Sequence, residues 1–448
     1  MSNQVVAKTT IPTGGWSDLW KKEDWWAVWL GLGIVFAAIV AWIFGSSIKS
    51  IAISVPAWTH FSEAIVYLQS KIGNFLLLYI AFLLVFSLAL KILGYKLKEF
   101  IPGFSVIFIL GTAVSIFGAW NWAKKYNLEA PLVALFLGII ISNVLPVPKW
   151  LDTALRTEFY VKTGIVLLGA TLPFTLILQA GPVAFSAASV VAVTTFLTIY
   201  WTATRVFKLD KRFAATLGAG GSICGVSASI AIGGSVKAEK QQVSVAISIV
   251  ILWAVVMVFL LPAIIKAWGI PAGPGGAWIG TSEFADAAGM AAASSLNEQA
   301  IKIFTLMKVV GRDMFVGLWC FIMALISITK WERIDGSTKP DKKEIWYRFP
   351  KFVLGFFLAS AVITILVAFA DTSTAKAITA KIINPIKELR TWAFIFTFLS
   401  IGLTTRLKEL TSVGWKPFAA FTTGVAVNVI LGYIVSVVVL GQYWVTIK

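Results

Sequence analysis

One stretch of the sequence, residues 218–235, constrains the fold more than any other because it is both apolar and rich in glycine. It reads GAGGSICGVSASIAIGGS, and six of its 18 residues are glycine, with serines and one cysteine between them. An uninterrupted membrane helix has no use for so much glycine and hydroxyl. A helix that breaks at membrane depth needs both, because its free backbone groups must find partners there. The stretch therefore predicts a discontinuous helix.

The composition of the chain indicates a membrane protein. Of its 448 residues, 58% are hydrophobic and 13% are charged, and the mean hydropathy is +0.85. A soluble domain carries about 25% charged residues. Many apolar segments exceed the roughly 17 residues that a helix needs to cross the hydrocarbon core of a bilayer. We expect an all-α polytopic membrane protein in the cell (inner) membrane.

The apolar segments predict 12 or 13 membrane segments. The clear spans lie at about 25–44, 75–93, 104–121, 129–146, 158–179, 182–204, 213–234, 242–266, 301–328, 351–370, 392–405 and 416–440. Residues 51–70 are amphipathic, which favours a helix lying at the membrane interface. Residues 274–299 are rich in glycine and alanine but carry two acids, which favours a re-entrant or discontinuous helix buried in protein.

The basic residues orient this arrangement. The net charge is +17, and basic residues cluster in the loops at 205–212 and 330–351. The positive-inside rule explains such clusters without nucleic acid and predicts that both loops are cytoplasmic. Their agreement needs an even number of crossings between them, so we count four: 213–234, 242–266, 274–299 and 301–328. The N-terminus then comes out cytoplasmic and the C-terminus outside.

An internal similarity suggests inverted repeats. Residues 168–184 read LGATLPFTLILQAGPVA and residues 400–419 read SIGLTTRLKELTSVGWKPFA. In the predicted orientation the helices before these motifs run in opposite directions, which is the plan of many secondary transporters. We divide the chain into a cytoplasmic segment 1–24, N-terminal membrane helices with the interfacial helix at 25–121, and a transporter membrane domain with inverted repeats at 122–442.

The break at 218–229 is the first candidate site. A half-helix that restarts after a break presents uncapped N–H groups and the positive end of its dipole, which suit an anion. The residues predicted to bind substrate there are Gly221, Ser222, Cys224, Gly225 and Ser227. The structural alternative is close packing of helices through small residues.

Charged residues in apolar segments are the second group of candidates. Glu283 and Asp286 lie three residues apart, and acids at membrane depth are usually proton or sodium sites; the alternative is that they are solvated at the interface. Lys308 and Arg312 lie one turn apart and would balance the charge of a bound anion. Their alternative is a structural ion pair, for example with the adjacent Asp313.

Two threonines complete the predicted set. Thr171 and Thr405 occupy similar positions in the two repeat motifs, which would bring both to the substrate near the centre. Two cysteines and one histidine support neither a disulfide framework nor a metal site. We therefore expect no cofactor besides H⁺ or Na⁺ as the coupling ion, and no enzyme, since no nucleophile–base or metal set is visible.

Several segments resemble a known family. GGSICGVSASIAIGGSVKAEKQQVSVAISIVILWAVVMVFLLP (220–262), TGIVLLGATL (163–172), KFVLGF (351–356) and SIGLTTRL (400–407) are similar to the YeiH-type family of sulfate exporters. The family is related to the bile acid/sodium symporter and cation/proton antiporter group. The resemblance implies inverted repeats, two crossed discontinuous helices and basic residues near 308–312. Sulfate is part of the family label and is not shown by these residues.

The chain departs from the family at one place. Family members carry a segment like DTxQVxxA, whereas residues 281–288 here read TSEFADAA, so the acidic residues have moved. We therefore expect residues 281–288 to influence the choice of ion or substrate differently here than the corresponding segment does in other family members.

These observations together predict a secondary transporter that moves a small inorganic or organic anion by alternating access, with the bilayer and the anion as its partners. The alternative on the same fold is a Na⁺ or other cation/proton antiporter. Primary active transport by this chain is disfavoured because the sequence has no G-x-x-x-x-G-K-[ST] motif. The sequence leaves open which anion is carried, in which direction, with which ion, and whether the chain forms a homo-oligomer.

Overall fold

The fold is helical throughout the described part of the chain. The computed structural model describes residues 17–125, 130–313, 316–332, 346, 349–406 and 414–447. Within these ranges, the bridge between Trp58 and Trp120 is the one β-type pairing. The all-α prediction is confirmed.

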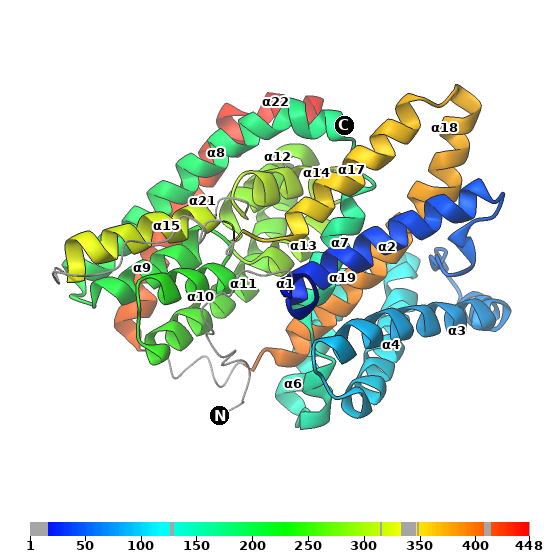
Figure 1. Cartoon of the computed structure of the whole chain (residues 1–448), viewed down its shortest axis with the longest axis horizontal. Coiled ribbons are helices and arrows are strands. Elements are labelled where there is room, and N and C mark those ends of the chain that lie inside the picture. The colour runs from blue at the N-terminus through cyan, green and yellow to red at the C-terminus, as the bar shows by residue number, and fades with distance from the viewer. Residues whose placement is uncertain are drawn as a thin grey trace.

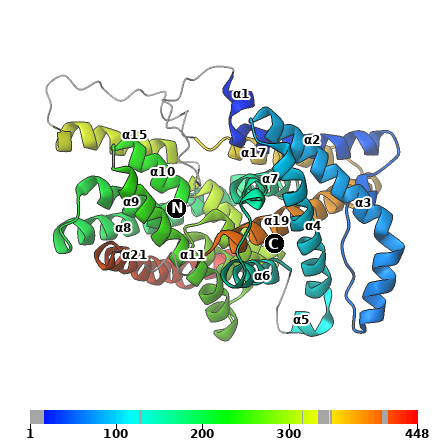
Figure 2. The same cartoon turned by 90° about the horizontal axis from the view of Figure 1, so that it is seen from below.

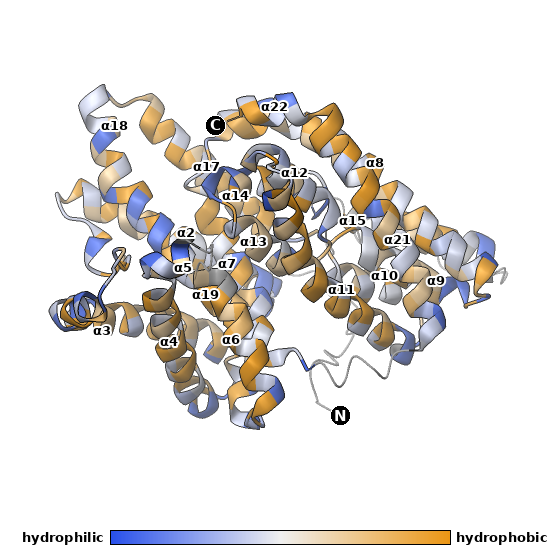
Figure 3. Ribbon diagram, turned by 180° about the vertical axis from the view of Figure 1, so that it is seen from behind, coloured by the Kyte–Doolittle hydropathy of each residue, from blue (hydrophilic) through white to orange (hydrophobic). Residues whose placement is uncertain are grey.

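Six of the described helices are long and apolar enough to cross a membrane. They are α2 (Glu23–Ile43), α3 (Phe61–Ile92), α4 (Leu97–Ala119), α8 (Phe174–Trp201) with its π-helical end η3 (Thr202–Val206), α11 (Lys240–Ala267), and α21 (Trp415–Tyr433) with η8 (Ile434–Val439). Large apolar side chains on these helices face outward, among them Leu84, Leu197 and Val438, and hydrophobic colour covers much of the outer ribbon in Figure 3. This is the surface that a bilayer covers.

Shorter helices fill the space between the long ones. They are α6 (Ala130–Val144), α7 (Thr157–Gly169), α14 (Glu298–Thr305) with η4 (Leu306–Val310), α15 (Val316–Ile326) with η6 (Ser327–Glu332), α17 (Phe352–Ala368) and α19 (Asn384–Thr404). The connections contain α1 (Asp18–Lys21), η1 (Ile48–Ser50), α5 (Asn121–Lys125), η2 (Lys149–Thr153), α18 (Thr372–Ile378), η7 (Thr379–Ile383) and α22 (Gly441–Thr446).

The helices form two groups with a central layer between them. Figure 1 shows α2, α3, α4, α6, α17 and α19 at one end of the molecule and α8, α9, α10, α15 and α21 at the other. The view from below keeps the same separation (Figure 2). Between the groups lie α12, α13 and α14 (Figure 1).

Two predicted boundaries are wrong. Residues 61–70 are the first turns of α3 rather than part of a separate interfacial helix. The segments 158–179 and 182–204 meet at residues 170–173, because Pro173 starts α8, and Pro182 lies inside that helix. Proline has no N–H and restricts the residue before it, which explains a break at Pro173; inside a membrane bundle a proline such as Pro182 is tolerated.

The glycine-rich segment forms a hairpin. α9 (Lys211–Ser222) and α10 (Val226–Ser235) are separate helices joined at 223–225. The chain folds back at these residues. The two ends of the segment lie together, as shown by the hydrogen bond that Arg212, at the start of α9, donates to the carbonyl of Lys237, beyond the end of α10, at 3.3 Å. The predicted break is confirmed, but the predicted crossing is wrong: both ends of this first hairpin lie on one face.

The segment 274–299 forms a second hairpin. α12 (Ala272–Ser282) and α13 (Asp286–Ser294) are joined by the extended residues 283–285. The Leu296 side chain, just after α13, lies against Gly275 near the start of α12, so this segment also returns to the face from which it entered. The re-entrant alternative of the prediction is therefore the correct one, in place of two crossed discontinuous helices.

The two hairpins enter from opposite faces, because the 28-residue helix α11 separates them in the chain. Two crossings, α11 and the run from α14 to η6, therefore connect the basic loops instead of the predicted four. The number remains even, and Arg205 and Lys330 line one pocket. The described ends of the two loops lie on the same face, as predicted; residues 333–345 of the second loop lie outside the described residues.

The helices around the two repeat motifs run antiparallel to each other. Along α7 and α19, Thr171 contacts Arg390 while Gly164, earlier in the chain, packs on Phe394, later in the chain. Along α8 and α21 with α22, Thr195 bonds to Asn428 and Gln179 to Tyr443. This opposed direction is the arrangement expected of inverted copies.

Candidate functional site

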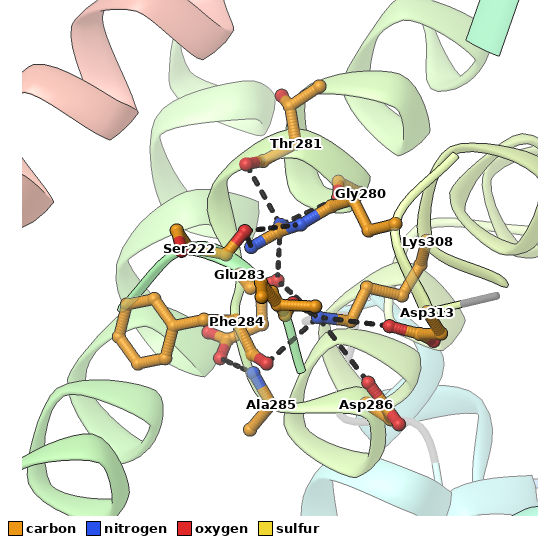
Figure 4. Close-up of polar contacts among 11 residues, drawn as sticks. Ser222, Gly280, Thr281, Glu283, Phe284, Ala285, Asp286, Lys308 and Asp313 are labelled. Carbon is orange, nitrogen blue, oxygen red and sulfur yellow. Dashed lines mark hydrogen bonds and ion pairs between the residues drawn. The ribbon is translucent and has the colours of Figure 1, made fainter. Parts of the chain in front are cut away.

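The tips of the two hairpins meet at one lysine. Lys308, in η4, is fully buried, and its ammonium donates to the carbonyl of Ile223 at 2.6 Å and to that of Phe284 at 2.8 Å. Figure 4 shows its side chain reaching the second tip. Gly225 of the first tip approaches the same Phe284 carbonyl so closely that a Cβ would lie 3.0 Å from it. One side chain thus joins segments that enter from opposite faces.

Arg312 donates hydrogen bonds to the C-terminal ends of α9 and α12, the first helix of each hairpin. Its Nε and Nη2 donate to the Ser222 carbonyl at 3.0 and 2.6 Å, and its Nη1 reaches the carbonyls of Gly280 and Thr281 at 3.1 and 3.0 Å. These carbonyls belong to the last turns of α9 and α12, where a helix leaves acceptors unpaired and has the negative end of its dipole. The two predicted cations, Lys308 and Arg312, are therefore both at the site, and their hydrogen bonds go to backbone carbonyl groups.

Three buried carboxylates accompany the two cations. Asp286 and Asp313 lie 3.3 and 3.9 Å from the Lys308 ammonium, and Oε1 of Glu283 accepts a hydrogen bond from the Ala285 amide at 3.0 Å (Figure 4). Glu283 and Asp286 are buried in protein, so solvation at an aqueous interface is not their setting. Oε2 of Glu283 and both carboxylate oxygens of Asp313 accept no hydrogen bond.

Neither restarted helix, α10 or α13, has a side-chain hydrogen bond capping its N-terminus. α10 begins after Gly225, which has a φ of 64° and no side chain to cap the free amides. Ser222, at the end of α9, is fully buried and its hydroxyl has no hydrogen-bond partner; Cys224 is buried and Ser227 half-buried beside it. The first tip thus combines open amides with an unused hydroxyl, as an anion site requires.

Thr171 and Thr405 do not join this site. Thr171 accepts a hydrogen bond from Arg390, which is paired with Glu298 at 3.0 Å. The carbonyl of Thr405 accepts from Ser142 at the end of α6, at 2.8 Å. The two threonines end α7 and α19, and those helices run antiparallel, so equivalent positions in the motifs are not brought together at the tips.

An ion-paired group at the start of α7 was missed by the sequence analysis. Lys162 lies 2.8 Å from Asp24 on α2 and 3.4 Å from Glu158. α7 packs on α13, the helix that begins with Asp286. The sequence did contain a signal for this group: Glu158 and Lys162 have opposite charges and lie four residues apart in a predicted span.

Fold and site together define a class. This is a helical membrane protein in which two re-entrant hairpins from opposite faces meet at a buried, charged centre. In the part of the chain that the structure describes, no group of three or more histidine, cysteine, aspartate or glutamate side chains is arranged to hold a metal ion.

Comparison with known proteins gives the family. The family described as conserved hypothetical protein 698 matches residues 102–421, and the chain belongs to this family of UPF0324, YeiH-type membrane proteins.

The relatives span different lengths. A UPF0324 membrane protein of Rhodopirellula baltica is 33% identical over 88% of this chain and 72% of its own length. A UPF0324 membrane protein of Nitratidesulfovibrio vulgaris is 30% identical over 79% of this chain, which spans 62% of that relative. The UPF0324 inner membrane protein YeiH of Escherichia coli is 26% identical over 72% of this chain and 89% of its own length. No solved structure matches the chain significantly.

Proposed function

We propose that the protein is a secondary transporter of a small anion that works by alternating access. The observation that carries this proposal is the meeting of two re-entrant hairpins from opposite faces at Lys308. Non-helical backbone at membrane depth is tolerated only where protein or a cavity surrounds it, and broken helices of this kind form the midplane sites of secondary transporters.

The anion would bind at the first tip. The amides at the start of α10 have no side-chain cap, and Ser222 supplies an unpartnered hydroxyl. Gly221 packs against Ile199 and Phe421, and Gly225 packs against the Phe284 carbonyl, so the two glycines allow the close packing that forms this tip. Lys308, which contacts this tip, would add positive charge, and its ion pair with Asp286 would weaken when the anion binds. A sulfur oxyanion or sulfonate is the cargo that the family label suggests.

Coupling would involve the acids of the second tip. Glu283 and Asp286 are the carboxylates carried by the second tip itself, and binding of H⁺ or Na⁺ there would compensate the charge of the anion. Glu158, Lys162 and Asp24 form a second ion-paired group where α7 packs on α13, and this group would take part in moving protons, as such groups do in transporters. With the basic loops inside, the N-terminus is cytoplasmic.

A ligand screen followed by a flux assay tests the proposal. The purified full chain would be melted in detergent with sulfate, sulfite, thiosulfate, phosphate, bicarbonate or small sulfonates, with and without Na⁺, at two pH values. A ligand that binds only the native state raises the melting temperature by mass action. We expect one anion class to do so and to be taken up by proteoliposomes; no stabilisation and no uptake of any anion would refute the proposal.

A second candidate, a cation/proton antiporter, is favoured by one observation. The site holds three carboxylates against two cations, and oxygens of Glu283 and Asp313 have no hydrogen-bond donor. Stabilisation by Na⁺ or by pH alone, with Na⁺-driven proton movement in proteoliposomes and no effect of any anion, would select this function.

A further inference from the structure

A basic pocket lies away from the hairpin tips, where the two basic loops come together. It has a volume of about 670 Å³, within the roughly 300–1,000 Å³ of small-molecule sites. It is lined by Tyr200, Thr204, Arg205, Lys208, Lys211, Thr329, Lys330 and Trp331. Four of these side chains are cationic and none is acidic, although they come from segments more than a hundred residues apart.

No described carboxylate neutralises this pocket. Asp210 and Glu332 are the acids closest in sequence. The Asp210 carboxylate accepts hydrogen bonds from the amides of Arg212 and Phe213 at 2.9 and 3.1 Å, capping α9, and the Glu332 side chain lies outside the described part of the chain. Clustered cations repel one another unless an anion lies between them. The positive-inside rule accounts for basic residues on this face, but it does not require them to converge on one hollow.

The walls of the pocket place it at the level of lipid headgroups. Tyr200 and Trp331 stack with ring centroids 6.2 Å apart, and aromatic residues of this kind concentrate at membrane interfaces. Leu197 and Trp201 lie at four-residue spacing before Arg205 and are 56% and 61% exposed. An apolar, outward-facing strip thus leads along α8 to the cationic rim.

We propose that this pocket binds a phosphate group, and that its source is the headgroup of an anionic phospholipid whose acyl chains lie along α8. Basic pockets between membrane helices bind such headgroups. Both chain segments that flank the pocket, η3 and η6, are π-helical, a geometry frequent at functional sites. This site is independent of the proposed transport function.

Lipid binding to the purified full chain tests the proposal. Native mass spectrometry would count bound phosphatidylglycerol after titration in mixed micelles, with phosphatidylcholine as the neutral comparison and inorganic phosphate as the soluble probe. We expect the Lys208→Gln/Lys330→Gln double variant to bind phosphatidylglycerol about 30-fold more weakly, because each basic residue near a membrane surface contributes about 1 kcal/mol.

Two control variants keep the test decisive. Lys49→Gln/Lys71→Gln removes the same charge from a different pocket, one that also contains Glu388, and should bind normally. Lys208→Arg/Lys330→Arg keeps the charge and should also bind. Loss with phosphatidylglycerol identifies a lipid headgroup, and loss confined to inorganic phosphate identifies a soluble phosphate. Absence of binding by both probes, or equal loss in the Lys49/Lys71 control, overturns the proposal.

Discussion

The two hairpins end and restart a helix at membrane depth in different ways. In the first, α10 restarts after Gly225 with its amides uncapped. In the second, α13 restarts at Asp286, and Glu283 accepts the amide of Ala285. The first turn of α10 thus contains no acid, whereas α13 has Asp286 in its first turn and Glu283 beside its start. Under the proposed function, these similar backbone shapes would serve opposite purposes, an anion site at the first tip and a cation or proton site at the second.

Removing the lysine that joins the tips should have the largest effect. Lys308→Met leaves carbonyls of both hairpins and the Asp286 carboxylate without a donor, and breaking a buried charged contact costs about 3–5 kcal/mol. We expect a large fall in the melting temperature of the purified protein. Lys302→Met, on the half-buried side of α14, is the control; equal melting of the two variants would show that the tips are held by other contacts.

Substitutions at one tip or the other sharpen the functional contrast. Ser222→Ala should weaken the apparent anion affinity at least about tenfold, because hydrogen bonds to charged groups contribute about 1.5–3 kcal/mol. Glu283→Gln should instead change the dependence of uptake on Na⁺ or pH and leave anion affinity near that of the wild type. Uptake assays over a range of anion concentrations and pH measure both. If the two variants show the same phenotype, anion binding and ion coupling are not assigned to separate tips.

The glycine of the first tip should tolerate alanine less well than a glycine with the same backbone angle elsewhere. Gly225 and Gly269 have φ of 64° and 63°, where a side chain is strained; the ψ of −116° at Gly225 lies outside the left-handed helical region that other residues can enter. At Gly225 the added methyl also meets the Phe284 carbonyl, whereas the space at Gly269 is open. Thermal unfolding should show a greater loss for Gly225→Ala; the reverse order would mean that the tips are not in close contact.

The start of the first hairpin should give the smallest effect. Asp210 caps α9, and its replacement by alanine should cost about 1 kcal/mol, as is usual for such caps. Asp210→Asn keeps the hydrogen-bond acceptor and should melt like the wild type. A loss as large in the asparagine variant would indicate that charge rather than capping matters at this position.

The sequence was sufficient for the class of fold and for the site of each break, because both depend on local composition. Glycines at 218–235 and the Gly/Ala-rich run at 274–299 predict interrupted helices without any tertiary information. The direction of the chain after each break was not predictable, since it depends on contacts such as Arg212 with Lys237. Counting crossings therefore gave four where the structure has two.

The same distinction holds for the site. Lys308, Arg312, Glu283 and Asp286 were found because charge is rare in apolar segments. Their partners were not, because the carbonyls that bind Lys308 and Arg312 carry no sequence signature. Glu158 and Lys162 were overlooked in a span that otherwise appears ordinary. The similar motifs that contain Thr171 and Thr405 gave no information about their partners, which are Arg390 and Ser142.

The single ammonium group shared by the two tips restricts how the molecule can change shape. A motion that pulled one hairpin from the other would break charge-assisted hydrogen bonds on at least one side of Lys308, each worth about 1.5–3 kcal/mol. A motion that carried both hairpins together past the surrounding helices would break none of them. The low-cost displacement is therefore a rigid-body shift of the paired hairpins, with η4 travelling as part of the same body.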